Sequence, residues 1–289
     1  YADAMEKMSH RRDELLQLLL LCCYVHRCRT LVSIDMLMAY FYDSSMGHEG
    51  IQKLIHQLGA LISEAQSLDL EQDYFSPRST IISEVIIDNA PAGQLGKMIK
   101  KFHRHISPYR IHRFDIFRRS AFDANLMSHA FPRWNDGVEF YTYVSNRDDS
   151  PFLKQQGAIY LAHKKRFDDA FIWIDDALTQ SGGRNFSIRN SHAVILFKAN
   201  IEKSESDGIV KKTLQNSMNI LAECYNDDKR KSYHAITFAD QAIRYYSKYA
   251  DAAALAYIST ALKWLEEEQL QSPWNKSIDR LLKQLRHVR

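Results

Sequence analysis

The chain has 289 residues, of which 45% are hydrophobic and 25% are charged, and its formal net charge is +3. Only 10 glycines and 6 prolines occur, so the composition favours a mainly α protein with one large or two ordinary domains. A charge this small does not by itself indicate a nucleic-acid-binding protein, and four cysteines in so long a chain do not make a secreted disulfide framework. We therefore expect a cytoplasmic protein.

The first hundred residues open with helix patterns. Residues 11–27 predict a buried helix, and their apolar run over residues 15–24 is too short to cross a bilayer and lacks the marks of a signal peptide. We expect no membrane partner. Ser33 is placed to cap a helix over residues 34–42, and apolar residues in helical register predict a long helix over residues 48–66. The chain begins with tyrosine, so we expect it to be a piece of a longer protein.

A short wing is predicted after these helices. Brief alternation around a polar turn predicts two strands, and a further helix is expected over residues 79–89. Three helices and a wing predict a winged-helix domain over residues 1–90. The residues of the wing are Leu68, Leu70, Tyr74 and Phe75.

Residues 91–149 predict a helical connector with a basic face. Pro91 and Pro108 each stand where a helix tolerates proline in its first turn, and Asp123 and Asp136 are placed to cap two more helices.

Cations dominate residues 97–119, where the single acid is Asp115. Four of them recur at i, i+3, i+4 and i+7, which places them on one stripe of a helix. Such a stripe is most often a solvated face, but it could also hold an acidic partner or nucleic acid, and the three glutamates at residues 266–268 are one possible counterpart within the chain. The candidate partner-binding residues are Lys97, Lys100, Lys101, Arg104, Arg110 and Arg113.

Residues 150–178 predict a tetratricopeptide-like helical hairpin. Ser150 can cap the first helix, Pro151 suits its first position, and Gly157 with Ala158 allow a partner helix to approach closely. One hairpin cannot bury its apolar face, so such units stack, and residues 150–289 predict an α-solenoid of hairpins. The apolar face of the second helix consists of Phe167, Ala170, Phe171, Ile174, Ala177 and Leu178.

Three stretches together resemble the carboxy-terminal half of bacterial STAND-type signalling ATPases, many of which act in antiviral defence. They are residues 11–75, residues 150–178, and residues 78–85, which read Arg-Ser-Thr-Ile-Ile-Ser-Glu-Val. The last is similar to the family's Arg-His-x-x-Ile-Ala-Glu segment, with Ser79 in place of histidine and Ser83 in place of alanine. The resemblance implies a winged helix and trigger-sensing helical repeats after a P-loop ATPase core. It also implies that Arg78 contacts the nucleotide or the ATPase interface.

The chemistry of an ATPase is not expected in this chain. Residues 93–98, Gly-Gln-Leu-Gly-Lys-Met, lack the spacing of a phosphate loop and the Ser or Thr after its lysine, and no catalytic motif stands out. We expect no enzyme activity, metal or cofactor in this segment, with ATP or ADP and Mg²⁺ bound by an upstream ATPase domain. The cluster of Cys22, Cys23, His26 and Cys28 is interpreted as core packing.

Two functions remain open at the level of sequence. The first is a non-catalytic sensor that binds a protein or peptide trigger, contacts the upstream ATPase domain and controls oligomerisation. The alternative is a transcription regulator with a DNA-binding winged helix and peptide-sensing repeats. Residues 48–66 carry one full positive charge, Lys53, against Glu49 and Glu64, so we expect packing and not nucleic-acid binding.

Overall fold

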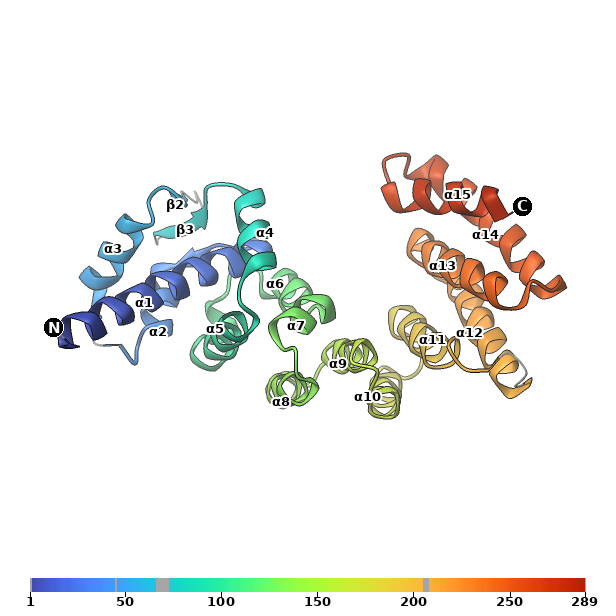
Figure 1. Cartoon of the computed structure of the whole chain (residues 1–289), viewed down its shortest axis with the longest axis horizontal. Helices are drawn as coiled ribbons and strands as arrows, with labels where there is room; N and C mark the ends of the chain where they lie inside the picture. Colours follow the sequence, from blue (N-terminus) through green and yellow to red (C-terminus); the bar gives the residue numbers. More distant parts are fainter. Residues whose placement is uncertain (1, 45, 66–72, 205–207, 289) are drawn as a thin grey trace. The chain divides into compact units, whose positions relative to one another are not determined.

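The protein is mainly helical, with one small antiparallel sheet. The computed structural model describes residues 2–44, 46–65, 73–204 and 208–288 (Figure 1). The chain divides into two compact units, Tyr1–Arg147 and Asp148–Arg289, which are described here one at a time.

The first unit contains the sheet and most of the shorter helices. Its elements in chain order are α1 (Ala2–Arg27), β1 (Val32–Ser33), α2 (Ile34–Tyr40), α3 (His48–Gln57), β2 (Ile62–Ala65), β3 (Tyr74–Pro77), α4 (Thr80–Asn89), α5 (Ala92–His105), the 3₁₀ turn η1 (Pro108–Arg110), α6 (Phe114–Ala121), α7 (Ala124–Ala130) and α8 (Trp134–Ser145).

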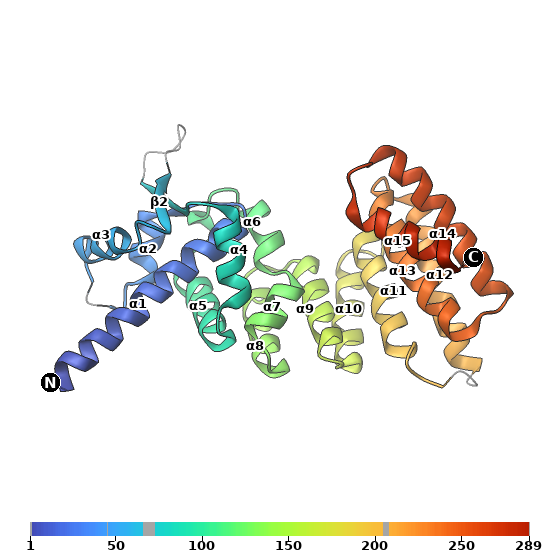
Figure 2. The same ribbon diagram turned by 45° about the horizontal axis from the view of Figure 1, so that its top comes forward.

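Helix α1 is the centre of this unit. It contacts α3, α4, α5, α6 and the strands β1 and β3, so its second half is covered on all sides (Figures 1 and 2). Leu18 and residues 20–25 are fully buried, which confirms the predicted buried helix. A helix that is apolar around its whole circumference is stable in water only when neighbours cover every face.

The sheet has the order β1–β3–β2, and both pairings are antiparallel. Val32 stands opposite Phe75, and Ile62 stands opposite Pro77; all four side chains are buried. Tyr74 and Phe75 therefore lie in a strand as expected, while Leu68 and Leu70 lie outside the described residues.

The long helix predicted over residues 48–66 was wrong in its second half. Helix α3 ends at Gln57, where the Leu58 amide bonds back to the carbonyls of Leu54 and Ile55, and residues 62–65 form strand β2. A helix and a short strand would both place Ile62 inward, so the apolar pattern does not distinguish them. Hydrogen-bonded pairing with β3 makes residues 62–65 a strand.

Most predicted helix starts are confirmed. The side chains of Ser33, Ser79 and Asp123 each accept a backbone amide at the beginning of α2, α4 and α7. Pro108 begins only the 3₁₀ turn η1. Asp136 does not cap a helix, because it lies in the first turn of α8 and pairs with Arg133.

The second unit consists of helices. They are α9 (Pro151–His163), α10 (Phe167–Gln180), α11 (Phe186–Asn200), α12 (Gly208–Asp227), α13 (Lys231–Tyr249), α14 (Ala252–Gln271) and α15 (Lys276–Val288). Within this unit, α9 packs on α10, α11 on α12 and α13 on α14, while α11 also contacts α9 and α13 (Figure 2). Helix α15 packs against α13 and α14.

The hairpin of α9 and α10 is close-packed, as the small residues predict. A Cβ atom added to Gly157 would lie 2.4 Å from two ring carbons of Trp173 on α10. Ala170, Ile174 and Ala177 are buried on the predicted face of α10. Ser150 occupies the cap position of α9, but its side chain makes no capping hydrogen bond, so that part of the prediction was wrong.

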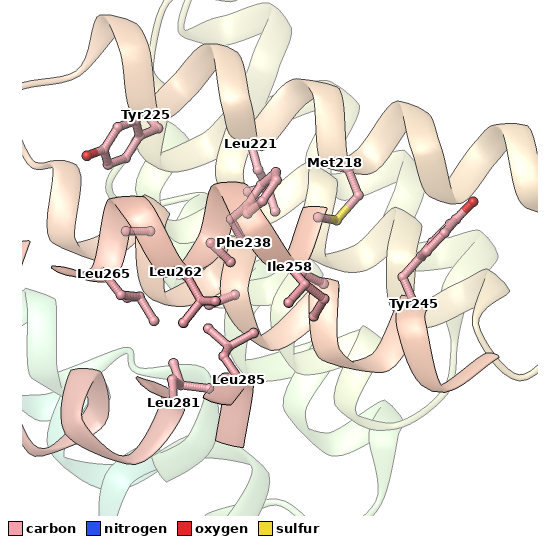
Figure 3. Close-up of a cluster of buried hydrophobic side chains, with 14 of the residues drawn as sticks. Met218, Leu221, Tyr225, Phe238, Tyr245, Ile258, Leu262, Leu265, Leu281 and Leu285 are labelled. Carbon is pink, nitrogen blue, oxygen red and sulfur yellow. The ribbon is translucent and has the colours of Figure 1, made fainter. Parts of the chain in front are cut away.

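A continuous apolar core joins the helices from α11 to α15 (Figure 3). Leu281 and Leu285 of α15 lie against Leu262 of α14 in this cluster. Tyr245 is fully buried, and Tyr225 stacks on Trp264 with ring centroids 3.9 Å apart. The recurring aromatic residues are therefore core residues, as their helical spacing predicts.

Candidate functional site

The predicted basic stripe lies on the outer face of α5. Its opposite face buries Leu95, Met98, Ile99 and Phe102, so the intervening cations point towards solvent. The helix itself is confirmed, and its packing explains one of the two glycines of the degenerate phosphate-loop motif. A Cβ atom on Gly96 would lie 2.6 Å from the carbonyl oxygen of Ala130 on α7, so this glycine allows close helix packing.

The two central cations of the stripe already have partners. Lys100 forms a 3.0 Å ion pair with Glu139 of α8 and lies over the ring of Phe131. Lys101 lies 4.8 Å from the centroid of the Tyr40 ring. Both ammonium groups thus hold neighbouring elements onto α5, which accounts for half of the stripe by packing.

The remaining candidate cations are exposed. Lys97, Arg104 and Arg110 have no ion pair within the described ranges, and Arg113 adopts a left-handed conformation, with φ of 53°, before α6. Arg104 borders a small hollow of about 40 Å³, lined also by Lys100, Glu139, Phe140 and Tyr143. This hollow is too small for a ligand much larger than water. The six cations therefore do not converge on one binding site.

The glutamates at residues 266–268 have partners within the second unit. Glu266 pairs with Arg286 at 3.3 Å, and Glu267 accepts a hydrogen bond from the Tyr225 hydroxyl at 3.1 Å. Glu268 is buried and bonded to Ser232. Their local partners therefore account for these acids.

Arg78 is exposed directly after strand β3. Its Nε donates a 2.9 Å hydrogen bond to the carbonyl oxygen of Gly59, and its backbone amide bonds to the carbonyl of Leu61. These two bonds hold the residue against the turn between α3 and β2. Among the described residues, only Nε of the guanidinium has a hydrogen-bond partner, so the two terminal nitrogens are available there for an anion or a protein acceptor.

A wider hollow lies on the outer face of α3. It has a volume of about 570 Å³ and is open to solvent. The residues around it offer cations and amides together with one carboxylate, a mixture that suits polar contacts to a macromolecule. They are Arg11, His48, Glu49, Gln52, Lys53, His56 and Gln57.

The cysteines belong to the core. Cys22, Cys23, Cys28 and Cys224 are free thiols and fully buried, and burial raises the pKa of Cys23 to about 12 and that of Cys224 to about 11. Thiols with raised pKa values are poor nucleophiles. His26 stands apart from them, half-buried, with its Nε2 3.4 Å from the Thr80 hydroxyl.

A buried histidine holds the centre of the first unit. His103 Nε2 lies 2.8 Å from the Tyr24 hydroxyl, which donates to the carbonyl of Ala121, and the rings of Phe102 and Phe122 flank the imidazole. Burial, reinforced by Arg147, lowers the pKa of His103 to about 3. The ring is therefore neutral at physiological pH and acts as a packing residue.

A second polar network ties α11 to α13. His234 is fully buried, with Nε2 2.9 Å from Asp228 and Nδ1 3.0 Å from the side-chain oxygen of Asn190. Although desolvation raises the pKa of Asp228, hydrogen bonds from His234 and Arg230 outweigh it and lower the pKa to about 2. Together these residues fix the register of neighbouring helix pairs.

Sequence reasoning missed this network because its partners are far apart in the chain. His234 and Asn190 are separated by 44 residues, and nothing local links them. A signal was nevertheless present, because His234 lies in the apolar register of Phe238 and Tyr245 and is buried; Gln241 in the same register is likewise buried and bonded to Ser217 at 2.8 Å, in a separate contact. A polar residue within an apolar helical stripe predicts a buried partner.

Comparison with known protein families, curated proteins and solved structures finds no match for this chain. Across the described ranges, no group of three or more histidine, cysteine or acidic side chains is placed to hold a metal ion. Among the described helices, none combines the length and the apolar character that a membrane crossing requires.

Proposed function

We propose that this chain is a non-catalytic sensor and regulatory segment of a STAND-type ATPase, acting in defence signalling in the bacterial cytoplasm. The second unit binds a protein or peptide trigger, and the first unit contacts an ATPase domain in the same polypeptide. The contact of the first unit with the ATPase domain helps to hold the polypeptide inactive, and trigger binding releases this restraint and allows the polypeptide to oligomerise. This mechanism requires that the trigger prefer the released state, because a ligand shifts an equilibrium only through its differential affinity.

The observation that carries the proposal is the packing of α9 to α14 as successive helical pairs. Helix pairs stacked in this way bury a continuous core and leave one ridge of each pair open along the stack. Such ridges suit an extended segment of a partner protein. The proposed assignment is therefore an α-solenoid of tetratricopeptide-like hairpins over residues 150–289.

The small sheet supports the assignment of the first unit. Strands β2 and β3 follow α2 and α3 and pair as an antiparallel ribbon, the order of elements in a winged helix. Arg78, held at the end of β3, is the residue we assign to the nucleotide or to the ATPase interface.

The role of Arg78 is tested in the intact polypeptide by its retention of ADP. We expect Arg78→Ala to release nucleotide faster, because the variant removes a guanidinium with two uncommitted nitrogens. Lys212→Ala is the matched control, since Lys212 is an exposed cation on α12 in the second unit. Equal retention by the two variants would remove Arg78 from this role.

A DNA-binding regulator is the second candidate, and the hollow on α3 favours it. Because Arg11 adds a cation beside Lys53, this face is less acidic than the sequence of residues 48–66 indicates. The candidate predicts that the chain binds a labelled DNA duplex at about 50 mM salt and loses most of the affinity at about 200 mM. It also predicts loss of binding in a variant that combines Lys53→Ala with neutral residues at Lys97 and Arg104.

A further inference from the structure

Two half-buried cations belong to neighbouring helices, α11 and α13. Lys198 lies near the end of α11, and Arg244 lies on α13, with its guanidinium carbon 5.8 Å from the centroid of the Phe197 ring. Phe197 is fully buried, whereas both cations are half-buried. Half-burial of such long side chains is typical when their aliphatic parts lie against apolar residues and their charged ends reach the surface.

Neither charge is neutralised by a direct partner. Within the described ranges, Lys198 and Arg244 have no ion pair and no side-chain hydrogen bond, whereas Lys211 in the same unit pairs with Asp251 at 2.6 Å. Burial lowers the pKa of Lys198, Arg244 lowers it further, and Asp240 acts in the opposite direction. Two like charges near one another, partly removed from water, bind an anion more favourably than isolated surface cations do.

Helix α13 also carries an exposed tyrosine about three turns before Arg244. Tyr233 is 49% exposed and precedes Arg244 by eleven residues. Eleven residues are close to three full turns, so both side chains lie on one face of α13, ~16 Å apart along the axis. An extended peptide covers that distance with about five residues.

We propose that Lys198 and Arg244 form an anchor for the carboxylate of an acidic peptide segment lying along α13, with an apolar residue about five positions away against Tyr233. This inference rests on the docking function proposed above and names the chemistry of its ligand. A peptide carboxylate fits better than nucleic acid, because only two cations form the anchor and Asp240 acts on Lys198 with the opposite charge. A polyphosphate chain needs an extended row of cations.

A displayed library of random peptides, selected against the whole chain, tests the inference. We expect the recovered peptides to share an aspartate or glutamate at one position, and we expect a Lys198→Gln, Arg244→Gln double variant to lose that preference. Peptides without an acidic position would overturn the anchor but leave the docking function standing. Failure to recover any peptide on folded protein would count against both.

Fluorescence anisotropy with one recovered acidic peptide gives the quantitative test. Lys198→Gln or Arg244→Gln should each weaken binding by about tenfold or more, and replacing the acidic residue of the peptide should weaken binding to the unaltered protein by the same factor. The altered peptide should bind the variant proteins no more weakly than it binds the unaltered protein. Asp240→Asn should strengthen binding, because it removes the local negative charge. Lys212→Gln is the matched control, and circular dichroism verifies that each variant folds. Equal affinities for Lys198→Gln, Arg244→Gln and Lys212→Gln would overturn the inference, as would a DNA duplex that displaces the peptide.

Discussion

Single residues in this protein show how local chemistry determines packing. Gly157 is required because Trp173 of α10 fills the space where a Cβ atom would lie. We predict that Gly157→Ala lowers the free energy of unfolding by about 1–3 kcal/mol, despite the better helix propensity of alanine. The control is Gly93→Ala on α5, where a Cβ atom meets nothing within 4 Å and alanine should be neutral or stabilising. Urea denaturation of both variants measures the two changes in the free energy of unfolding. Equal changes for Gly157→Ala and Gly93→Ala would disprove the close contact.

Asp228 makes stability depend on pH in acid. Its pKa is about 2 in the fold, below the ordinary value of 3.8, so its stabilisation is complete above the ordinary value and is lost as the pH falls towards 2. We predict that Asp228→Asn costs roughly 1–2 kcal/mol near neutral pH and almost nothing near pH 2. Unfolding measured across this range should show the difference shrinking. Asp227→Asn, at an exposed neighbour, should show no such trend.

The burial and contacts of a residue could be predicted when its partners lie close to it in the sequence. Gly157 and the buried positions of α10 follow from spacing within one hairpin, and the buried cysteines of α1 follow from the apolar run around them. The hydrogen bonds of His234 and the contact of Arg244 with the Phe197 ring depend on which helices become neighbours, which no local pattern determines.

At the scale of elements, helix ends carry identifiable strain. Ala250 ends α13 in a left-handed conformation with φ of 47°, which favours glycine. We predict that Ala250→Gly raises the free energy of unfolding by about 1 kcal/mol. The same substitution at Ala256, exposed inside α14, should lower it by about 1 kcal/mol. Thermal unfolding of the two variants should therefore shift in opposite directions, and shifts of the same sign would contradict the assigned end of α13.

Elements were predictable where periodicity runs over several turns. Helices α5, α9 and α10 begin within one or two residues of their signals at Pro91, Ser150 and Arg166. Strand β2 was missed because four residues are too few to distinguish alternation from helical spacing, and its pairing with β3 is a contact that local propensity does not determine.

At the scale of the whole molecule, the proposed function gives the two units separate tasks. In that proposal, the packed helical pairs of residues 148–289 bind the trigger, and the sheet-bearing unit of residues 1–147 contacts the ATPase domain through Arg78. The candidate site was predicted only in part from the sequence. The spacing of the cations predicted the basic stripe on α5, but Lys100 pairs with Glu139 and Lys101 lies over the Tyr40 ring. Lys198 and Arg244 were not predicted, because each is a single cation within an apolar helical segment.

The proposed restraint is tested most directly by the oligomeric state of the intact polypeptide in ATP, measured by sedimentation velocity with and without residues 1–289. We predict a monomer for the intact polypeptide and larger assemblies when both units are removed, because the contact between the first unit and the ATPase domain is then lost. Identical sedimentation of the two forms would contradict the proposed restraint.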